Sequence, residues 1–277
     1  MPALYTTIGP WTLLTYTVAL ALGIAVSAAF GLTRAGSLRR AGEVIDVLLA
    51  ALAGGLALAR LEHVLLNWNY FAYNVSEAFR LNAGGLDWHG AAGGGIIAGS
   101  LAARWRHVSA RDLLDAMTPA APLLGLAGWY GCWAANCAYG VEVDTLAHFP
   151  AWAVAESADI YGIAEPRYNT QIFGQWLAAV LLVFALILMW RGWLRGPRFW
   201  LVLALFSAGM FVIGFFRGDY AVIVRGLRLD QWLDALMLAV SFQQSAVSKI
   251  FNAKLQRGGD AETRANSQSP TANSQRS

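Results

Sequence analysis

The sequence predicts an all-α integral membrane protein of seven transmembrane helices, with the amino terminus outside and the carboxyl terminus in the cytoplasm. Hydrophobic residues make up 57% of the 277 residues and charged residues only 13%, whereas a soluble domain carries about 25% charged residues. Seven apolar runs alternate with polar segments, and Lys and Arg gather in every second segment. The net charge of +3, distributed in this way, gives no support to a nucleic-acid partner.

The apolar runs have the length that a membrane span needs, since a helix rises 1.5 Å per residue and the hydrocarbon core is about 30 Å thick. The expected spans are residues 11–32, 44–66, 90–103, 113–139, 172–190, 199–216 and 229–247. The third run, residues 90–103, is short, so we expect its helix to include Trp88 and His89 in order to span the membrane. The first is too long for a signal-peptide core and lacks a basic leader, so we expect it to remain as an anchor.

These spans give one membrane domain, residues 1–248, with outer loops at about 67–88 and 140–171. The tail, residues 249–277, is polar and low in apolar residues, so we expect it to be disordered in the cytoplasm. Positive charge fixes the orientation. One side holds arginines 34, 39, 40, 104, 106, 111, 191, 195 and 198 together with the tail, and the other side holds only arginines 80, 167, 217, 225 and 228. The positive-inside rule places the first set in the cytoplasm.

The chain has two cysteines, Cys132 and Cys137. If both lie on one helix, residues five apart point about 140° away from each other, which disfavours a bridge. We therefore expect free, buried thiols.

A histidine among glycines stands where the polar loop before the third span becomes apolar, at His89 within residues 82–100. Glycines let a ligand or a neighbouring backbone approach closely, although a glycine run also serves close helix packing in lipid. Other polar residues share the same outer depth: Tyr16, Arg60, Glu62, His63, Asn136, Tyr139, Gly140, Gln171, Arg217, Asp230, Gln231 and Asp234.

Charged groups at membrane depth usually face a protein interior or a watery cavity, but near helix ends Arg60 or Arg217 could instead extend its charged group to the interface. If the set forms one site, cations, an imidazole and aromatic rings face the outer leaflet. A phospholipid headgroup fits such a site, with arginine on the phosphate and histidine available as a base.

Several motifs resemble those of the prolipoprotein diacylglyceryl transferase family, bacterial membrane enzymes that lipidate the lipobox cysteine of secreted precursors. Residues 84–90, GGLDWHG, resemble its GG-x-x-(F/W)-HGG signature. Residues 127–140 follow the frame of its G-R-x-G-N-F-x-N-x-E-x-(Y/W)-G signature, and residues 166–173 resemble its P-R-x-P-(S/T)-Q-L-Y stretch. Shorter likenesses lie at residues 8–16, 60–67, 215–217 and 230–233.

The resemblance implies attack of the substrate thiol on the glyceryl carbon of phosphatidylglycerol, with glycerol phosphate leaving, in the bacterial inner membrane and at its outer leaflet. No cofactor or metal is expected. His89 stands at the family's essential histidine and Tyr16 at its first-span tyrosine, so both are candidate catalytic residues. The candidate substrate-binding residues are Arg60, Arg217, Gly140, Gln171 and Asn136.

The chain also departs from the family pattern. Trp129 and Met210 stand at the positions of two family arginines, and Gly214 replaces a glutamate. Cys132 and Ala135 replace asparagines, and Cys137 replaces a glutamate. Losing a phosphate-directed donor of this kind costs about 10²-fold or more in rate.

Three interpretations follow. The first is a working diacylglyceryl transferase that uses Arg60, Arg217 or loop arginines such as Arg225 and Arg228 on the phosphate. The second is a same-fold enzyme that uses another lipid or acceptor with His89 as base, and the third is a catalytically degenerate lipid-binding or scaffold protein. A transporter is disfavoured because the polar residues gather at one face and no inverted repeat is visible.

Overall fold

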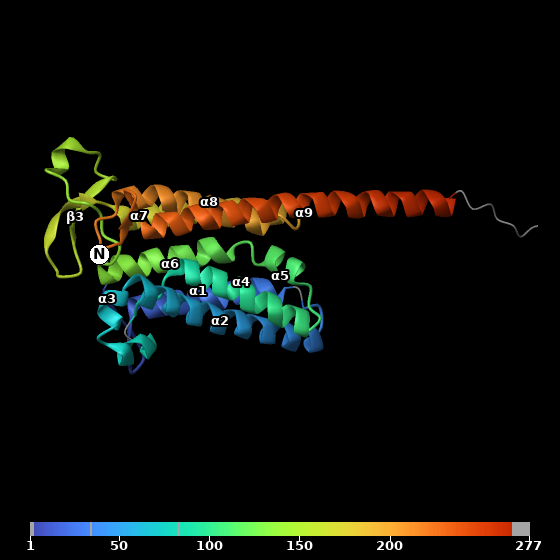
Figure 1. Ribbon diagram of the computed structural model, residues 1–277, viewed down its shortest axis with the longest axis horizontal. Helices are drawn as coiled ribbons and strands as arrows, with labels where there is room; N and C mark the ends of the chain where they lie inside the picture. The colour runs from blue at the N-terminus through green and yellow to red at the C-terminus, as the bar shows by residue number, and fades with distance from the viewer. Residues whose placement is uncertain (1–2, 34, 82–83, 268–277) are drawn as a thin grey trace, which may run out of the picture.

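The computed structural model describes residues 3–33, 35–81 and 84–267. Within these ranges, only the backbone is described for residues 38–39 and 249–267. Long helices run roughly parallel to one another, and a β-hairpin and short helices gather at one end (Figure 1). We call this end, which carries β3 (Val154–Ala158), β4 (Ala164–Tyr168) and α3 (Trp68–Phe71), the hairpin end. Arg34, Asn82 and residues 268–277, which entered the sequence predictions, lie outside the described residues.

The long helices are α1 (Thr15–Leu32), α2 (Leu38–Leu66), α4 (Trp88–Trp105), α6 (Ala120–Ala135), α7 (Thr170–Trp190), α8 (Arg198–Ile213) and α9 (Leu229–Ser267). The short elements are α5 (Ala110–Ala116) and the 3₁₀ turns η1 (Val75–Phe79), η3 (Leu146–His148) and η4 (Gly214–Phe216). Four segments of the described chain are long and apolar enough to cross a membrane: Thr15–Leu32, Arg40–Leu66, Thr170–Trp190 and Arg198–Phe216. The protein is therefore mostly helical, with membrane-spanning helices.

Two predicted runs do not form single helices. Residues 11–14 of the first run form β2 (Trp11–Leu14), which pairs antiparallel with β1 (Tyr5–Ile8), because Gly9 and Pro10 make a turn and Gly9 adopts a φ of +59°. The run at residues 113–139 breaks before α6, because Pro119 lacks the N–H that a helix interior needs. A third short hairpin joins β5 (Ile223–Val224) to β6 (Leu227–Arg228).

The predicted disorder of the tail is corrected as far as residue 267, because α9 continues unbroken from Leu229 to Ser267 and projects well past the other helices (Figure 1). Ala253, Lys254, Leu255 and Gln256 favour helix, and extending an existing helix avoids the cost of nucleation. Low hydrophobicity alone therefore misled the prediction.

Close backbone contact joins α2 and α4. A methyl group added at Gly94 would collide with the carbonyl oxygen of Gly54, and one added at Gly90 would collide with the carbonyl oxygen of Leu58. The expected packing function of the glycines after His89 is thus confirmed at these positions. α6 packs on α1 and α7, α8 packs on α7, and α9 packs on α8.

Replacing Gly94 with alanine should lower the thermal unfolding temperature by roughly 4 °C or more, because overpacking costs about 1–3 kcal/mol. The adjacent Gly93→Ala is the matched control, since a methyl group there meets nothing within 4 Å. Thermal unfolding of both variants in detergent checks the prediction. Equal unfolding temperatures would show that the α2–α4 contact tolerates a methyl group.

Candidate functional site

His89 lies buried at the start of α4 with a carboxylate on each side of its ring. Its Nε2 is hydrogen-bonded to Oδ1 of Asp234 on α9 at 2.9 Å, and its Nδ1 lies 3.2 Å from Oε1 of Glu62 on α2. The N–H of Gly90 donates to the other oxygen of Glu62, and the Trp88 ring lies against the imidazole at 4.2 Å between centroids. Three helices therefore hold this one side chain.

The two contacts of the imidazole differ in kind. Asp234 makes a hydrogen bond, whereas Oε1 of Glu62 is buried without a hydrogen bond of good geometry in the described structure. An acidic partner on one nitrogen orients a histidine ring and stabilises the positive charge that forms when the other nitrogen takes a proton. The two carboxylates thus orient the imidazole and stabilise its protonated form, as a proton-accepting histidine needs.

A second polar group lies at the same end, where two arginines and two aspartates form a closed set of ion pairs. Arg217 contacts Asp219 through Nε at 2.9 Å and Nη2 at 2.5 Å, and contacts Asp230 through Nη1 at 2.9 Å. Arg228 contacts the same two aspartates, at 3.3 Å and 3.1 Å. We call these four residues the ion-pair square. The side chains are 9 to 21% exposed, so neither arginine extends freely into solvent.

Arg60 is buried and faces backbone instead of an open site. Its Nε donates to the carbonyl oxygen of Ala78 at 2.9 Å, its Nη2 to that of Glu77 at 2.5 Å, and its Nη1 to those of Gly84 and Gly85 at 2.5 and 3.1 Å. These bonds use four of the five N–H donors of the guanidinium. Arg60 therefore fixes the loop that leads into His89.

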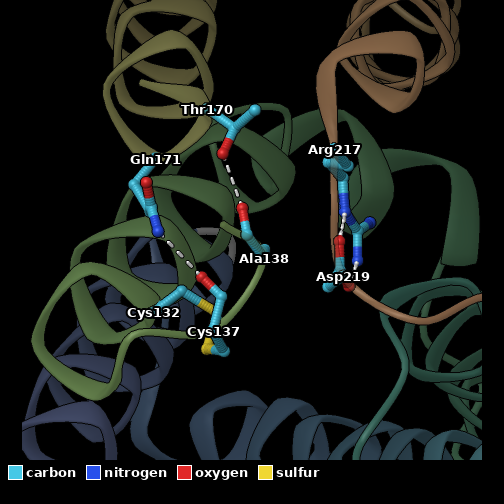
Figure 2. Close-up of a disulfide and its surroundings, with 7 residues drawn as sticks. All are labelled: Cys132, Cys137, Ala138, Thr170, Gln171, Arg217 and Asp219. Carbon is cyan, nitrogen blue, oxygen red and sulfur yellow. Dashed lines mark hydrogen bonds and ion pairs between the residues drawn. A yellow bond between two sulfur atoms is a disulfide. The ribbon is translucent and has the colours of Figure 1, made fainter. Parts of the chain in front are cut away.

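The turn after α6 corrects the prediction for the cysteines: Cys132 and Cys137 form a disulfide (Figure 2). The helix ends at Ala135, and Asn136 adopts the left-handed conformation with a φ of 54°, so Cys137 turns back toward Cys132 instead of continuing the helix. The helical angle of 140° does not apply once the chain has left the helix. The same turn involves two of the predicted site residues, Asn136 and Gln171, since Nε2 of Gln171 donates to the carbonyl oxygen of Cys137 at 3.1 Å.

Gly140 lies where three segments of chain cross. It bridges to Arg217 in antiparallel register, and a methyl group at Gly140 would collide with the carbonyl oxygen of Tyr168. Arg167 reaches the carbonyl oxygen of Gly140 at 3.5 Å and pairs with Glu142 at 2.7 Å. Only glycine fits this crossing, so Gly140 sets the place of Arg217 through the backbone.

Tyr139, next to Gly140, lies under the guanidinium of Arg167, whose carbon is 5.0 Å from the ring centroid. The aromatic contact adds to the ion pair that Arg167 makes with Glu142.

Tyr16, the other predicted catalytic residue, is half-buried near the start of α1. Its ring packs directly on Gly131 of α6, where a methyl group would collide with it. Among the described residues, no hydrogen bond joins Tyr16 to His89 or Arg217. Thus the structure brings His89 together with Glu62 and Asp234, and brings Arg217 together with Gly140, but leaves Tyr16 outside both groups.

Trp129 and Met210 belong to one buried apolar cluster with Ala178, Leu181, Phe206 and Ile213. The Trp129 ring lies so close to Gly174 that no other residue would fit there. Both positions at which the motifs suggest lost arginines are therefore filled by mutually compatible apolar side chains, with Trp88 packed against the same cluster.

Asp219 is the site residue that the sequence analysis missed. The available signal was its spacing, an acidic residue two positions after Arg217 in a short loop. The sequence placed Asp230 and Asp234 in the set of polar residues expected at one depth, but it did not indicate their partners.

A family model described as prolipoprotein diacylglyceryl transferase matches residues 2–245. The chain is similar to three proteins named phosphatidylglycerol–prolipoprotein diacylglyceryl transferase. It is 28% identical to that of Clostridium novyi over 76% of this chain and 81% of the relative, and 29% identical to that of Paenarthrobacter aurescens over 83% and 76%. It is 29% identical to that of Shouchella clausii over 84% and 85%.

If Arg60 fixes the loop, Arg60→Gln should speed amide hydrogen exchange in residues 77–81 by about tenfold or more, because hydrogen bonds to a charged group contribute about 1.5–3 kcal/mol each. Exchange followed by mass spectrometry measures this. Arg80→Gln removes an exposed arginine within the same segment and serves as the control. Unchanged exchange in Arg60→Gln would leave Arg60 available for a substrate.

Proposed function

The chain belongs to the prolipoprotein diacylglyceryl transferase family, and from that membership we propose that it transfers the diacylglyceryl group of phosphatidylglycerol to the lipobox cysteine thiol of secreted precursor proteins. The observation that carries the proposal is the burial of His89 between Glu62 and Asp234. A transferase that uses a thiol nucleophile needs a base of this kind.

In the proposed reaction the imidazole of His89 takes the proton of the substrate thiol, whose ordinary pKa is about 8.5. The thiolate attacks the glyceryl carbon, the bond from that carbon to the phosphate oxygen breaks, and glycerol phosphate leaves with the electron pair. Asp234 and Glu62 stabilise the imidazolium. Arg217 is the proposed cation for the phosphate charge.

The other candidate residues have supporting functions in this proposal. Gly140 places Arg217 through the backbone bridge, while Asn136 and Gln171 shape the turn beside it. Arg60 acts on the substrate indirectly, by fixing the loop before His89. Tyr16 keeps its proposed catalytic function on the strength of its motif position.

We also propose the finer topology: seven spans in the bacterial inner membrane, the amino terminus outside, the carboxyl terminus in the cytoplasm, and the site at the outer leaflet. Two observations support this orientation. The arginine-poor loops lie at the hairpin end, and the disulfide at that end fits an oxidising compartment.

Reporter fusions check the topology. Alkaline phosphatase, which is active only outside the cytoplasm, should be active when inserted in the exposed loop at residue 161 and inactive when fused after residue 248. Green fluorescent protein should give the opposite pattern. Active phosphatase after residue 248 would overturn the orientation.

Two alternatives have one observation in their favour, the apolar cluster at Trp129 and Met210. A catalytically degenerate lipid-binding paralogue would need no phosphate-directed arginine there. A same-fold enzyme acting on another lipid or acceptor would place its cations elsewhere.

The proposed function predicts that this chain restores lipoprotein maturation in bacterial cells depleted of their own transferase. His89→Ala should lower the rate by about 10²–10⁴-fold, measured as lipidated precursor in membranes that contain equal amounts of each variant. The variant Asp144→Asn, whose side chain is 69% exposed and pairs with His148, is the control.

Failure of the natural chain at normal membrane abundance would contradict the transferase proposal. Activity that appears only in the double variant Trp129→Arg with Met210→Arg would identify a degenerate paralogue. A new lipid species formed without precursor lipidation, and abolished by His89→Ala, would identify the same-fold enzyme.

A further inference from the structure

Asp219 occupies the side of Arg217 that recognises oxyanions. The two oxygens of its carboxylate face Nε and Nη2 of the guanidinium, at 2.9 and 2.5 Å. This parallel pair of hydrogen bonds is the geometry with which arginine holds both carboxylates and phosphates. Figure 2 shows Asp219 beside Arg217, across from the disulfide turn.

A second arginine, Arg228, contacts the same Asp219 carboxylate. Nη2 of Arg228 lies 3.3 Å from Oδ1 of Asp219, and Nη1 of Arg228 donates to its backbone carbonyl oxygen at 2.9 Å. The carboxylate is therefore enclosed by two cations, as a bound anion would be. Arg228 remains anchored without it, because its Nε also contacts Asp230.

Asp219 is the exchangeable partner in the ion-pair square. Asp230 lies in the first turn of α9 and accepts hydrogen bonds from the N–H of Gln231 and from both arginines. Asp219 lies in the loop between η4 and β5, flanked by Gly218 and the 76% exposed Tyr220. A loop residue without secondary-structure constraint can move away at lower cost than one fixed in a helix.

We propose that the Asp219 carboxylate occupies the place of a lipid phosphodiester between Arg217 and Arg228, and that the lipid displaces it on binding. This rests on the proposed function and specifies how the phosphate is held. A phosphodiester carries one negative charge, as a carboxylate does, so the exchange leaves the net charge of the cluster unchanged. Binding to an empty pair of arginines would instead add an anion next to Asp230 and Asp234.

The surroundings favour a lipid over a soluble phosphate. Phe215, Tyr220 and Ile223 flank the two arginines along the chain and are 56%, 76% and 62% exposed. Aromatic and aliphatic side chains beside a phosphate site match the apolar part of a phospholipid, and they offer nothing to a small hydrophilic phosphate.

The proposal predicts that Asp219→Asn binds phosphatidylglycerol about tenfold more tightly than the unmodified chain, since the internal competitor loses its charge. Binding is measured by native mass spectrometry of the full chain titrated with phosphatidylglycerol. Asp144→Asn removes an equivalent charge from an exposed loop and should leave the affinity unchanged. Arg217→Gln with Arg228→Gln should weaken binding about tenfold or more. Equal or weaker binding by Asp219→Asn would overturn the proposal.

A second test uses the unmodified chain, so its result does not depend on whether a variant folds. Hydrogen exchange of residues 218–224 should become faster in phosphatidylglycerol nanodiscs than in phosphatidylcholine nanodiscs, because displacement of Asp219 releases the loop. Soluble glycerol phosphate, added to phosphatidylcholine nanodiscs, should have no effect. Equal exchange in both lipids would overturn the proposal, and an effect of glycerol phosphate would overturn its restriction to lipid.

Measurements of phosphatidylglycerol binding and of precursor lipidation distinguish the exchange of Asp219 from the transferase function. If Asp219→Asn binds phosphatidylglycerol more tightly but the unmodified chain lipidates no precursor, the phosphate site stands and the transferase function fails. If the unmodified chain lipidates precursor but Asp219→Asn shows no gain in affinity, the transferase stands and the exchange fails.

Discussion

The contact between the backbones of α2 and α4 is the constraint on which the site depends. Because Gly54, Gly90 and Gly94 have no side chains, the helices approach until the N–H of Gly90 reaches the carboxylate of Glu62. The same approach places His89 beside Glu62, and α9 brings Asp234 to the other side of the ring. Arg60, two residues before Glu62 along α2, holds the loop that enters α4. The close contact of α2 and α4 thus determines both the packing of these helices and the geometry around His89.

Charge compensation is the second organising principle at the hairpin end. Four carboxylates, those of Glu62, Asp219, Asp230 and Asp234, accompany His89, Arg217 and Arg228, so each of these basic side chains has an acidic partner before any substrate arrives. An unpaired charge buried here would cost several kcal/mol. The resting protein therefore satisfies its cations internally, and a substrate has to compete for them.

Much of the helical scaffold was predictable, because apolar runs such as residues 172–190 report their length and environment directly. His89, Glu62 and Asp234 could be recognised as polar residues at one depth, since a membrane penalises such residues elsewhere. The partners could not be predicted. Arg60 and Arg217 look alike in the sequence, yet one binds backbone carbonyls and the other aspartates, because a side chain's partners depend on tertiary contacts between distant segments. The cysteine prediction failed for a local reason, the left-handed Asn136 that ends α6.

The disulfide has a chemical consequence for a protein that handles thiols. Both cysteines of the chain are joined to each other, and they lie at the same end as Arg217 and its partners (Figure 2). A reduced cysteine there would resemble the nucleophile of the proposed reaction and could itself become lipidated. With both sulfurs bonded, the protein offers no thiol of its own to the proposed reaction and does not compete for the lipid donor of that reaction.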